Sequence, residues 1–452
     1  MDQALERIVG RLRVVMTAAD ELAAMPAGGA QFLTRVGRAY SQIGAHDRAA
    51  PFFRRAVEAT PGDPACHYNL GAALVFTGDF AGAKTHLLKA VELEPRHFPA
   101  WYSLTVLEKQ TLFANHIPQL EAQFAGDDPD GARTLHIGHA LAKTYEDLGD
   151  WGTSFDWLVK AKAERGRRAD YSASGEHATF AAARAAAEVP ATGPGFETEE
   201  PIFVVGLPRT GTTLIDSILC AHPDVTSGGE LGIFPVLAKH LSGAAAEATV
   251  FDPAVFAGAA QTDMGRLGRL YMEATRPLSG KTARFVDKTT GNILFAGLIL
   301  KALPKARIVC LRRDPMDSVV SYFRHMFFHW PHVYPSVYDL RHAAVHYALF
   351  HALADHWRRT LPADRYYEIG YEQLVADQEG ETRRLLDFAG LPYDARSLAF
   401  HEQPRVVATA SAVQVRQPVY GSAVGRWRRY GDRLAPALEV LRATGVIADE
   451  AA

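Results

Sequence analysis

The chain has 452 residues, of which 48% are hydrophobic and 22% are charged, and it is long enough for two or three globular domains. Its net charge of −3 means that the protein surface as a whole is not positively charged, so we expect no nucleic-acid partner. A local basic pocket is compatible with this net charge. Three widely spaced cysteines without a CxxC pair indicate a reducing, cytoplasmic location. The most apolar run, GNILFAGLILKALP, is too short to cross a bilayer, so we expect no membrane span.

The first third of the chain has a helical pattern with an internal repeat. Residues 1–28 are charged and predict an N-terminal helix, not a signal peptide. From residue 29 onward a 34-residue period links four pairs of positions: Gly37 and Gly71, Ala49 and Ala83, Ala56 and Ala90, and Pro61 and Pro95. This frame resembles the tetratricopeptide repeat, a helix pair that buries its apolar face by stacking on neighbouring pairs. We predict a helical solenoid over 29–170 with two clear and two degenerate repeats.

The repeats admit two interpretations. One is a helical packing domain without a partner. The other is a concave surface that binds a peptide or protein. After the repeats, residues 163–198 contain a helical patch and end in a Pro/Gly/acidic stretch around EVPATGPGFETEE, so we place a linker at 171–198 and a second domain at 199–452.

The second domain alternates strand and helix signals. Strands are predicted at 203–206, 284–287, 307–311 and 366–370. Helices are predicted between and after them, at 212–221, 292–303, 318–328, 343–360 and 382–389. This order predicts a P-loop-like α/β domain with a parallel sheet covered on both faces.

The first predicted strand runs into the glycine loop GLPRTGTT, which precedes a helix. Backbone N–H groups at a helix N-terminus bind anions, and the side chains of Arg209, Thr212 and Thr213 add donors. Thr212 stands where a nucleoside-triphosphate-binding loop has lysine. The alternative is a tight strand-to-helix turn with a capping threonine.

A second candidate site follows the strand predicted at 307–311, in the stretch RIVCLRRDPMDSVVSYF. Arg313 at the end of this strand and Ser321 on the next helix are placed to bind a second phosphate, because ligands collect at the carboxyl ends of parallel strands. Alternatively, Arg313 forms a surface salt bridge with Asp314 or Asp317.

Two stretches resemble segments of sulfotransferases. The 5′-phosphosulfate loop of that family is closely similar to FVVGLPRTGTTLIDSILCAHPDV, which is followed here by GGEL. Its 3′-phosphate-binding segment is similar to RIVCLRRDPMDSVVSYF. The resemblance covers roughly residues 201–434 and is closest to the tyrosylprotein sulfotransferases, and to bacterial proteins that fuse tetratricopeptide repeats to such a domain. It implies 3′-phosphoadenosine-5′-phosphosulfate (PAPS) as donor and 3′,5′-adenosine diphosphate (PAP) as product, without a metal. It assigns to the 5′-phosphosulfate loop Arg209, Thr210, Gly211, Thr212 and Thr213. It assigns Arg313 and Ser321 to the 3′-phosphate.

The resemblance also implies catalytic roles. Lys288, in FVDKTTGN, matches a lysine near the bridging oxygen of the donor, where a cation stabilises the charge on the leaving phosphate; the alternative is a salt bridge with Asp287. Glu230 matches the general base of the tyrosylprotein enzymes, although a carboxylate there is also favoured by a helix dipole. His222 is the rival base, because small-molecule sulfotransferases use histidine, and we favour Glu230.

Four further residues are assigned by resemblance. Tyr371, in GYEQLV, corresponds to a tyrosine near the nucleotide. Ser411 corresponds to a serine at the phosphates of the donor and is expected to take part in catalysis. Arg416 and Arg426 are candidates for the 3′-phosphate, although a run of arginines is also compatible with a solvated basic face. The family often has Lys-Pro where this chain has Gln417-Pro418.

Three functions remain at this stage. The first is PAPS-dependent sulfuryl transfer to a peptide tyrosine, partly held by the repeats, or to a small phenol, sugar or lipid headgroup. The second is a P-loop nucleotide kinase. Thr212 in place of the usual lysine argues against it, and Asp287 would be its best candidate for binding magnesium. The third is an inactive transferase scaffold. The scattered histidines provide no metal-ligand set, and the oligomeric state stays open.

Overall fold

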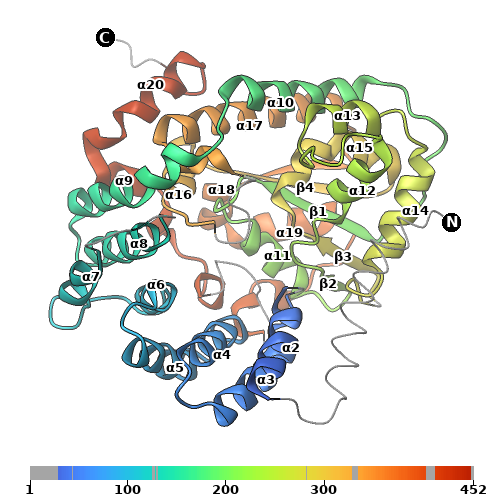
Figure 1. Ribbon diagram of the computed structural model, residues 1–452. Helices are drawn as coiled ribbons and strands as arrows, with labels where there is room; N and C mark the ends of the chain where they lie inside the picture. The colour runs from blue at the N-terminus through green and yellow to red at the C-terminus, as the bar shows by residue number, and fades with distance from the viewer. Residues whose placement is uncertain are drawn as a thin grey trace.

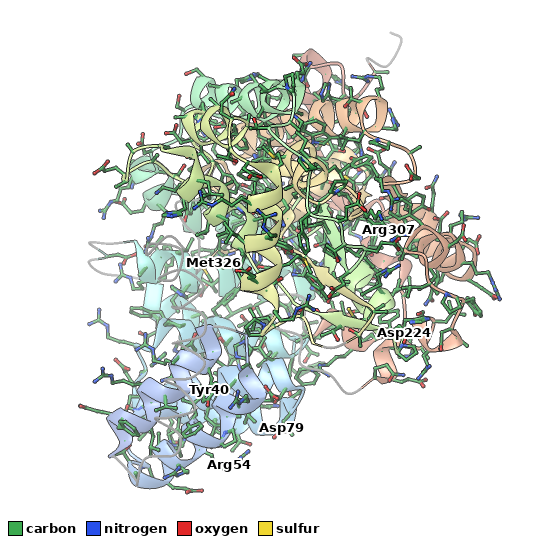
Figure 2. The ribbon with its side chains drawn as sticks, turned by 90° about the vertical axis from the view of Figure 1, so that its right-hand side faces the viewer. Tyr40, Arg54, Asp79, Asp224, Arg307 and Met326 are labelled. Atoms are coloured by element: carbon green, nitrogen blue, oxygen red, sulfur yellow. The ribbon has the colours of Figure 1, made fainter. Side chains whose placement is uncertain are left out.

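The computed structural model describes residues 29–42, 44–124, 128, 131–280, 282–327, 334–403 and 413–448. The helix predicted over 1–28 lies outside the described residues. The described chain forms a helical domain, blue to teal in Figure 1, and an α/β domain, green to red. In Figure 2, Tyr40, Arg54 and Asp79 mark the helical domain, and Asp224 and Arg307 belong to the α/β domain.

The helical domain is a series of packed helix pairs, with α2 on α3, α4 on α5, and α8 on α9. Their bounds are α2 (Ala30–Gln42), α3 (His46–Ala59), α4 (Pro64–Thr77), α5 (Phe80–Leu93), α6 (Phe98–Leu107), α7 (Ile117–Phe124), α8 (Ala132–Asp147) and α9 (Trp151–Arg168). Helices α4, α5 and α9 begin after an aspartate whose side chain accepts a hydrogen bond from a first-turn N–H, which satisfies one of the free donors at each helix start.

The 34-residue frame has a steric cause. A Cβ atom at Gly37 would lie 2.6 Å from the ring of Phe53, so the paired helices touch at this glycine. Thr105, 34 residues after Gly71, occupies the same frame position in the third unit, where α6 and α7 have only 10 and 8 residues and both pack on α8. Gly138 restores the close contact in the fourth pair, since its Cβ would lie 2.6 Å from Cβ of Ala161. The predicted solenoid, including its degenerate third unit, is confirmed.

The segment 171–198, placed as a linker after a helical patch, contains helix α10 (Ala173–Glu188). The side chains of Phe180, Ala183 and Ala186 are buried in the core of the α/β domain. A Cβ at Gly297 would lie 2.4 Å from Cβ of Ala187, so α10 packs closely on the second domain. The apolar face of this helix therefore makes α10 part of the α/β domain.

The α/β domain is built on a five-stranded parallel sheet of order β2-β3-β1-β4-β5. The strands are β1 (Pro201–Gly206), β2 (Val225–Ser227), β3 (Arg284–Asp287), β4 (Arg307–Arg312) and β5 (Tyr366–Gly370). Four were predicted, and β2 was not. Phe203 and Val205 of β1 belong to one core, and Ile202 and Val204 to another, because alternate residues of a strand point to opposite faces.

Helices cover both faces of the sheet (Figure 1). Those in the first part of the domain are α11 (Thr212–Cys220), α12 (Ile233–Ser242), α13 (Pro253–Ala259), α14 (Met264–Thr275), η1 (Thr290–Phe295), α15 (Ala296–Ala302), α16 (Pro315–Phe323), η2 (Pro335–Tyr338) and α17 (Leu340–Thr360). Those that follow are α18 (Tyr371–Ala376), α19 (Gln378–Phe388), η3 (Ala395–Ser397), η4 (Phe400–Glu402), η5 (Gln414–Arg416), η6 (Gly421–Ala423), η7 (Arg426–Leu434) and α20 (Ala435–Ala443).

The chain switches direction across the sheet between β1 and β4: β2 and β3 lie on one side of β1, and β4 and β5 on the other. In open parallel sheets this switch point leaves a crevice at the carboxyl ends of the strands. Both predicted phosphate sites lie there, after β1 and after β4. No helix among the described residues combines the length and the apolar character needed to cross a membrane.

Candidate active site

The loop between β1 and α11 has an unusual backbone. Arg209 has φ 68°, and no other non-glycine residue in the described part of the chain has a positive φ. Gly211 ends the loop with φ 115° and is the N-cap of α11, where no side chain makes a capping hydrogen bond. The Thr210 hydroxyl donates to the Leu207 carbonyl at 2.7 Å and holds the turn. Strained backbone of this kind clusters at ligand sites, and the start of α11 presents N–H groups suited to an anion.

Arg313 and Ser321 meet this loop. The Ser321 hydroxyl donates to the Arg209 carbonyl at 2.9 Å, and Nη1 of Arg313 donates to the same oxygen at 3.4 Å. The Arg313 guanidinium lies 4.6 Å from the ring centroid of Tyr371. A Cβ atom at Gly211 would lie 3.0 Å from the Tyr371 ring. Residues from β1, β4, α16 and α18 therefore converge at one point.

A pocket of about 120 Å³ lies at this point. Four guanidinium groups line it, those of Arg209, Arg313, Arg324 and Arg426, beside one carboxylate, that of Asp317. Asp317 also accepts hydrogen bonds from the backbone N–H groups of Gly425 and Trp427. The excess of positive charge suits a ligand with two or more negative charges. Burial lowers the pKa of Arg209, which reflects the cost of a guanidinium held away from water.

The pocket contains most, not all, of the predicted donor-binding residues. Thr213, Gly211, Ser321 and Tyr371 line it with the four arginines. The side chains of Thr210 and Thr212 are buried beneath the loop. Ser411 lies outside the described residues. The Arg416 guanidinium lies elsewhere, on the turn between α4 and α5, where Nη2 donates to the Phe76 carbonyl at 3.0 Å.

Lys288 follows β3, and its ammonium pairs with the carboxylate of Glu230. The Lys288 side chain is 1% exposed, and that of Glu230 is 52% exposed. Asp287, the alternative partner for Lys288, instead accepts hydrogen bonds from Tyr271 and Thr289 in a fully buried position, and burial raises its pKa. An accessible carboxylate beside a buried cation can accept a proton and stabilise negative charge in one place.

His222 is held by structural hydrogen bonds. Its Nδ1 accepts from the Asp224 N–H at 3.1 Å, so Nε2 carries the proton and donates to the Pro392 carbonyl at 3.1 Å. The side chain is 2% exposed. Since both ring nitrogens are used, this histidine has no free nitrogen for a substrate proton, and Glu230 is the better candidate for the base.

Residues 201–395 match the model of the sulfotransferase family. The α/β domain is a sulfotransferase domain. Residues 42–106 match the tetratricopeptide repeat, so the chain joins repeats of this type to a sulfotransferase domain.

Among curated relatives, an uncharacterized protein of Aquifex aeolicus is 29% identical over 410 residues, or 87% of this chain and 52% of that protein. The protein-tyrosine sulfotransferase of Drosophila melanogaster is 24% identical over 252 residues, 50% of this chain and 46% of that protein. The chain therefore spans about half the length of these two relatives. A solved sulfotransferase domain of the Synechococcus PCC 7002 olefin synthase has a TM-score of 0.39 at 19% identity, and the match covers 59% of this chain and 99% of that domain.

Several residues that line this pocket or contact its arginines were not predicted from the sequence. Gln414 accepts a hydrogen bond from Nη2 of Arg209 at 2.9 Å, and Arg324 extends the row of arginines. Glu146, in the repeat domain, pairs with both Arg324 and Arg426. Arg324 lies three residues after Ser321, about one turn further along and directly after α16, and this spacing was the available signal. The sequence carries no signal for Gln414, which lines the pocket, or for Glu146, which contacts two of its arginines from the repeat domain.

Proposed function

We propose that the protein transfers a sulfuryl group from PAPS to the hydroxyl group of an acceptor. One observation supports this most strongly: the strained loop after β1 and the pair Arg313–Ser321 meet in one pocket lined by four guanidinium groups. An anion site at a helix N-terminus, next to a second cationic site, suits a nucleotide with charged groups at both its 5′ and 3′ positions.

The residues of this pocket fit the proposed donor. The start of α11, with Arg209, Gly211 and Thr213, would hold the 5′-phosphosulfate. Arg313 and Ser321 would hold the 3′-phosphate, and both already make polar contacts with the loop. Tyr371, stacked under Arg313, would fix the orientation of that guanidinium. When bound, the donor supplies an activated sulfuryl group on its 5′-phosphate.

Glu230 and Lys288 are proposed to carry out the proton and charge steps. The acceptor oxygen forms a bond to sulfur while the bond from sulfur to the 5′-phosphate oxygen breaks, in line. Glu230 takes the hydroxyl proton, which it must do in the transition state because a phenol has a pKa of about 10. Lys288 stabilises the negative charge that develops on the leaving phosphate. The products are a sulfate ester and 3′,5′-adenosine diphosphate.

The acceptor is proposed to be a phenol, either the tyrosine of a peptide or a small molecule. The distant tyrosine-modifying relatives and the accessible position of Glu230 support this choice. Repeats of this type commonly present a concave surface to peptides, so the repeat domain is proposed to hold part of a peptide acceptor.

Thermal unfolding with three ligands tests the donor class. A ligand that binds only the native state raises stability by about 2.7 kcal/mol at a hundredfold excess over Kd. We expect a clear rise in Tm with 3′,5′-adenosine diphosphate, a smaller rise with 5′-AMP and none with Mg-ATP. A rise in Tm with Mg-ATP alone would overturn the proposal in favour of a kinase. No change in Tm with any of the three ligands would favour an inactive scaffold. Transfer of labelled sulfate from PAPS to a tyrosine peptide and to a small phenol then identifies the acceptor.

A further inference from the structure

Glu146 lies near the C-terminal end of α8, in the repeat domain, yet its bonding partners belong to the sulfotransferase domain. Its carboxylate pairs with the guanidinium groups of Arg324 and Arg426. It also accepts a hydrogen bond from the Tyr430 hydroxyl at 3.0 Å. The Glu146 side chain is 5% exposed, so this carboxylate is a buried counter-ion shared by two arginines.

Both arginines line the donor pocket. Arg324 directly follows α16, the helix that carries Ser321, and Arg426 begins η7. Two guanidinium groups at one wall repel each other when they are removed from water. A single carboxylate behind them offsets that repulsion and fixes their rotamers, while the pocket keeps its excess of positive charge.

The repeat domain also contacts, at a second place, the segment that contributes to the lining of this pocket. Gln414 accepts the hydrogen bond from Arg209, and Arg416, two residues later, donates to the carbonyl of Phe76 in the last turn of α4. The segment from Gln414 to Arg426 is therefore held by the repeats at both of its ends, through Arg416 and Arg426. Contacts at two ends of one pocket wall favour a role in shaping the pocket.

We propose that Glu146 is a positioning residue for the donor site, by which the repeat domain sets Arg324 and Arg426 for binding the phosphate groups of an adenosine bisphosphate. The inference rests on the proposed function. It deepens that function by making the repeat domain a part of the donor site, in addition to any part in acceptor binding.

The test measures the affinity of the full chain for 3′,5′-adenosine diphosphate by isothermal titration calorimetry. Glu146→Gln keeps the shape of the side chain but removes the charge and presents N–H donors to the guanidinium groups. We expect its affinity to fall by about tenfold or more, because two long side chains must then be ordered on binding. The affinity for 5′-AMP, tested in the same way, should fall less. If Glu146→Gln does not fold, Glu146→Asp, which keeps the charge but shortens the reach, should show the same loss.

The matched control is Asp156→Asn. Asp156, on α9, pairs with Arg433 of η7, so it also joins the repeat domain to η7. Its side chain is exposed and does not line the pocket. The Asp156→Asn variant should bind the diphosphate as the wild type does. A second test separates positioning from a structural role: in an Arg324→Gln/Arg426→Gln background, Glu146→Gln should have no further effect on affinity.

Three outcomes would overturn the inference. Equal affinity of Glu146→Gln and wild type would make Glu146 a structural contact only. Tighter binding by Glu146→Gln would make it a competitor of the ligand. An equal loss with Asp156→Asn would indicate a general loosening of the two domains. If the wild type itself does not bind 3′,5′-adenosine diphosphate, the proposed function fails and this inference with it.

Discussion

The ammonium group of Lys288 pairs with the carboxylate of Glu230, although 58 residues separate them in the sequence. The lysine is buried and the glutamate is half exposed. The two groups come from the segments that follow β3 and β2, which are neighbours in the sheet. A pair with this asymmetry allows an acceptor to reach the base while the cation stays fixed, so substitutions at the two positions should have different effects.

Glu230→Gln should reduce kcat by about 10²–10⁴-fold, the usual contribution of a general base, with little change in the affinity for 3′,5′-adenosine diphosphate. The amide keeps the size of the side chain but cannot take the proton. Steady-state transfer assays and calorimetry measure the two quantities. Glu247→Gln, at an exposed site, is the control. An equal loss of binding and turnover would show that Glu230 is structural and that the base lies elsewhere.

Lys288→Ala should reduce kcat by about 10²–10³-fold, the typical cost of removing one charge-stabilising donor. Unlike Glu230→Gln, it removes a cation proposed to lie beside the 5′-phosphate, so it should also lower the affinity for 3′,5′-adenosine diphosphate. Lys305→Ala breaks a surface ion pair with Glu197 of 2.7 Å and should leave activity unchanged. Activity of Lys288→Ala close to that of the wild type would remove this lysine from the mechanism.

Gly138→Ala should destabilise the repeat domain. The new Cβ would lie 2.6 Å from Cβ of Ala161 and 3.0 Å from its Cα, so the backbone of α9 must move. Overpacking costs about 1–3 kcal/mol and the gain in helix propensity offsets about 1 kcal/mol, leaving a net loss. Gly62→Ala, where nothing lies within 4 Å, is the control. Urea unfolding followed by circular dichroism should show an earlier first transition for Gly138→Ala only.

Lys162 should make stability depend on pH. Burial lowers its pKa from 10.5 to about 7, and its ammonium donates to the His325 carbonyl at 3.0 Å. Between these two values the unfolded chain binds one more proton than the native chain. The free energy of unfolding should therefore rise with pH over this range, by at most about 1.4 kcal/mol per pH unit.

Lys162→Met should lose that rise and be more stable than the wild type at pH 7. His139 and His325, whose pKa values burial also lowers, are neutral in this range and do not add to the effect. Lys160→Met, exposed on the same helix, should keep the wild-type pH dependence. If the free energy of unfolding of Lys162→Met and of the wild type changed with pH in parallel, the prediction that Lys162 is buried in its neutral form would be wrong.

Local patterns predicted the repeat frame and four strands, and they singled out the glycine loop and the pair Arg313–Ser321, which the structure brings together. Each of these depends on residues close in sequence, such as Gly206 and Gly211 around the loop, or on a fixed period such as Gly37 and Gly71. Strand β2 was missed because three residues are too few for an alternating pattern. A helical patch was predicted before β1, but its place in the core of the α/β domain was not, because the buried face of α10 consists largely of alanine, which marks no clear apolar stripe.

The C-terminal assignments depended on contacts that no local pattern encodes. Arg416 and Phe76 are 340 residues apart, and Arg426 and Glu146 are 280 apart. The resemblance to sulfotransferases covers the second domain alone. It therefore gives no information on contacts between the arginines of that domain and the repeat domain. For this reason Arg416 was predicted at the 3′-phosphate, while the structure places it on the repeats.

These separations also bear on how the protein is made. During synthesis the repeats and the strands emerge from the ribosome well before the segment from Gln414 to Arg426. Contacts between such distant residues form late, since closing a long loop costs entropy before the contact stabilises it. We therefore expect the sheet to form before the pocket lined by this segment is complete.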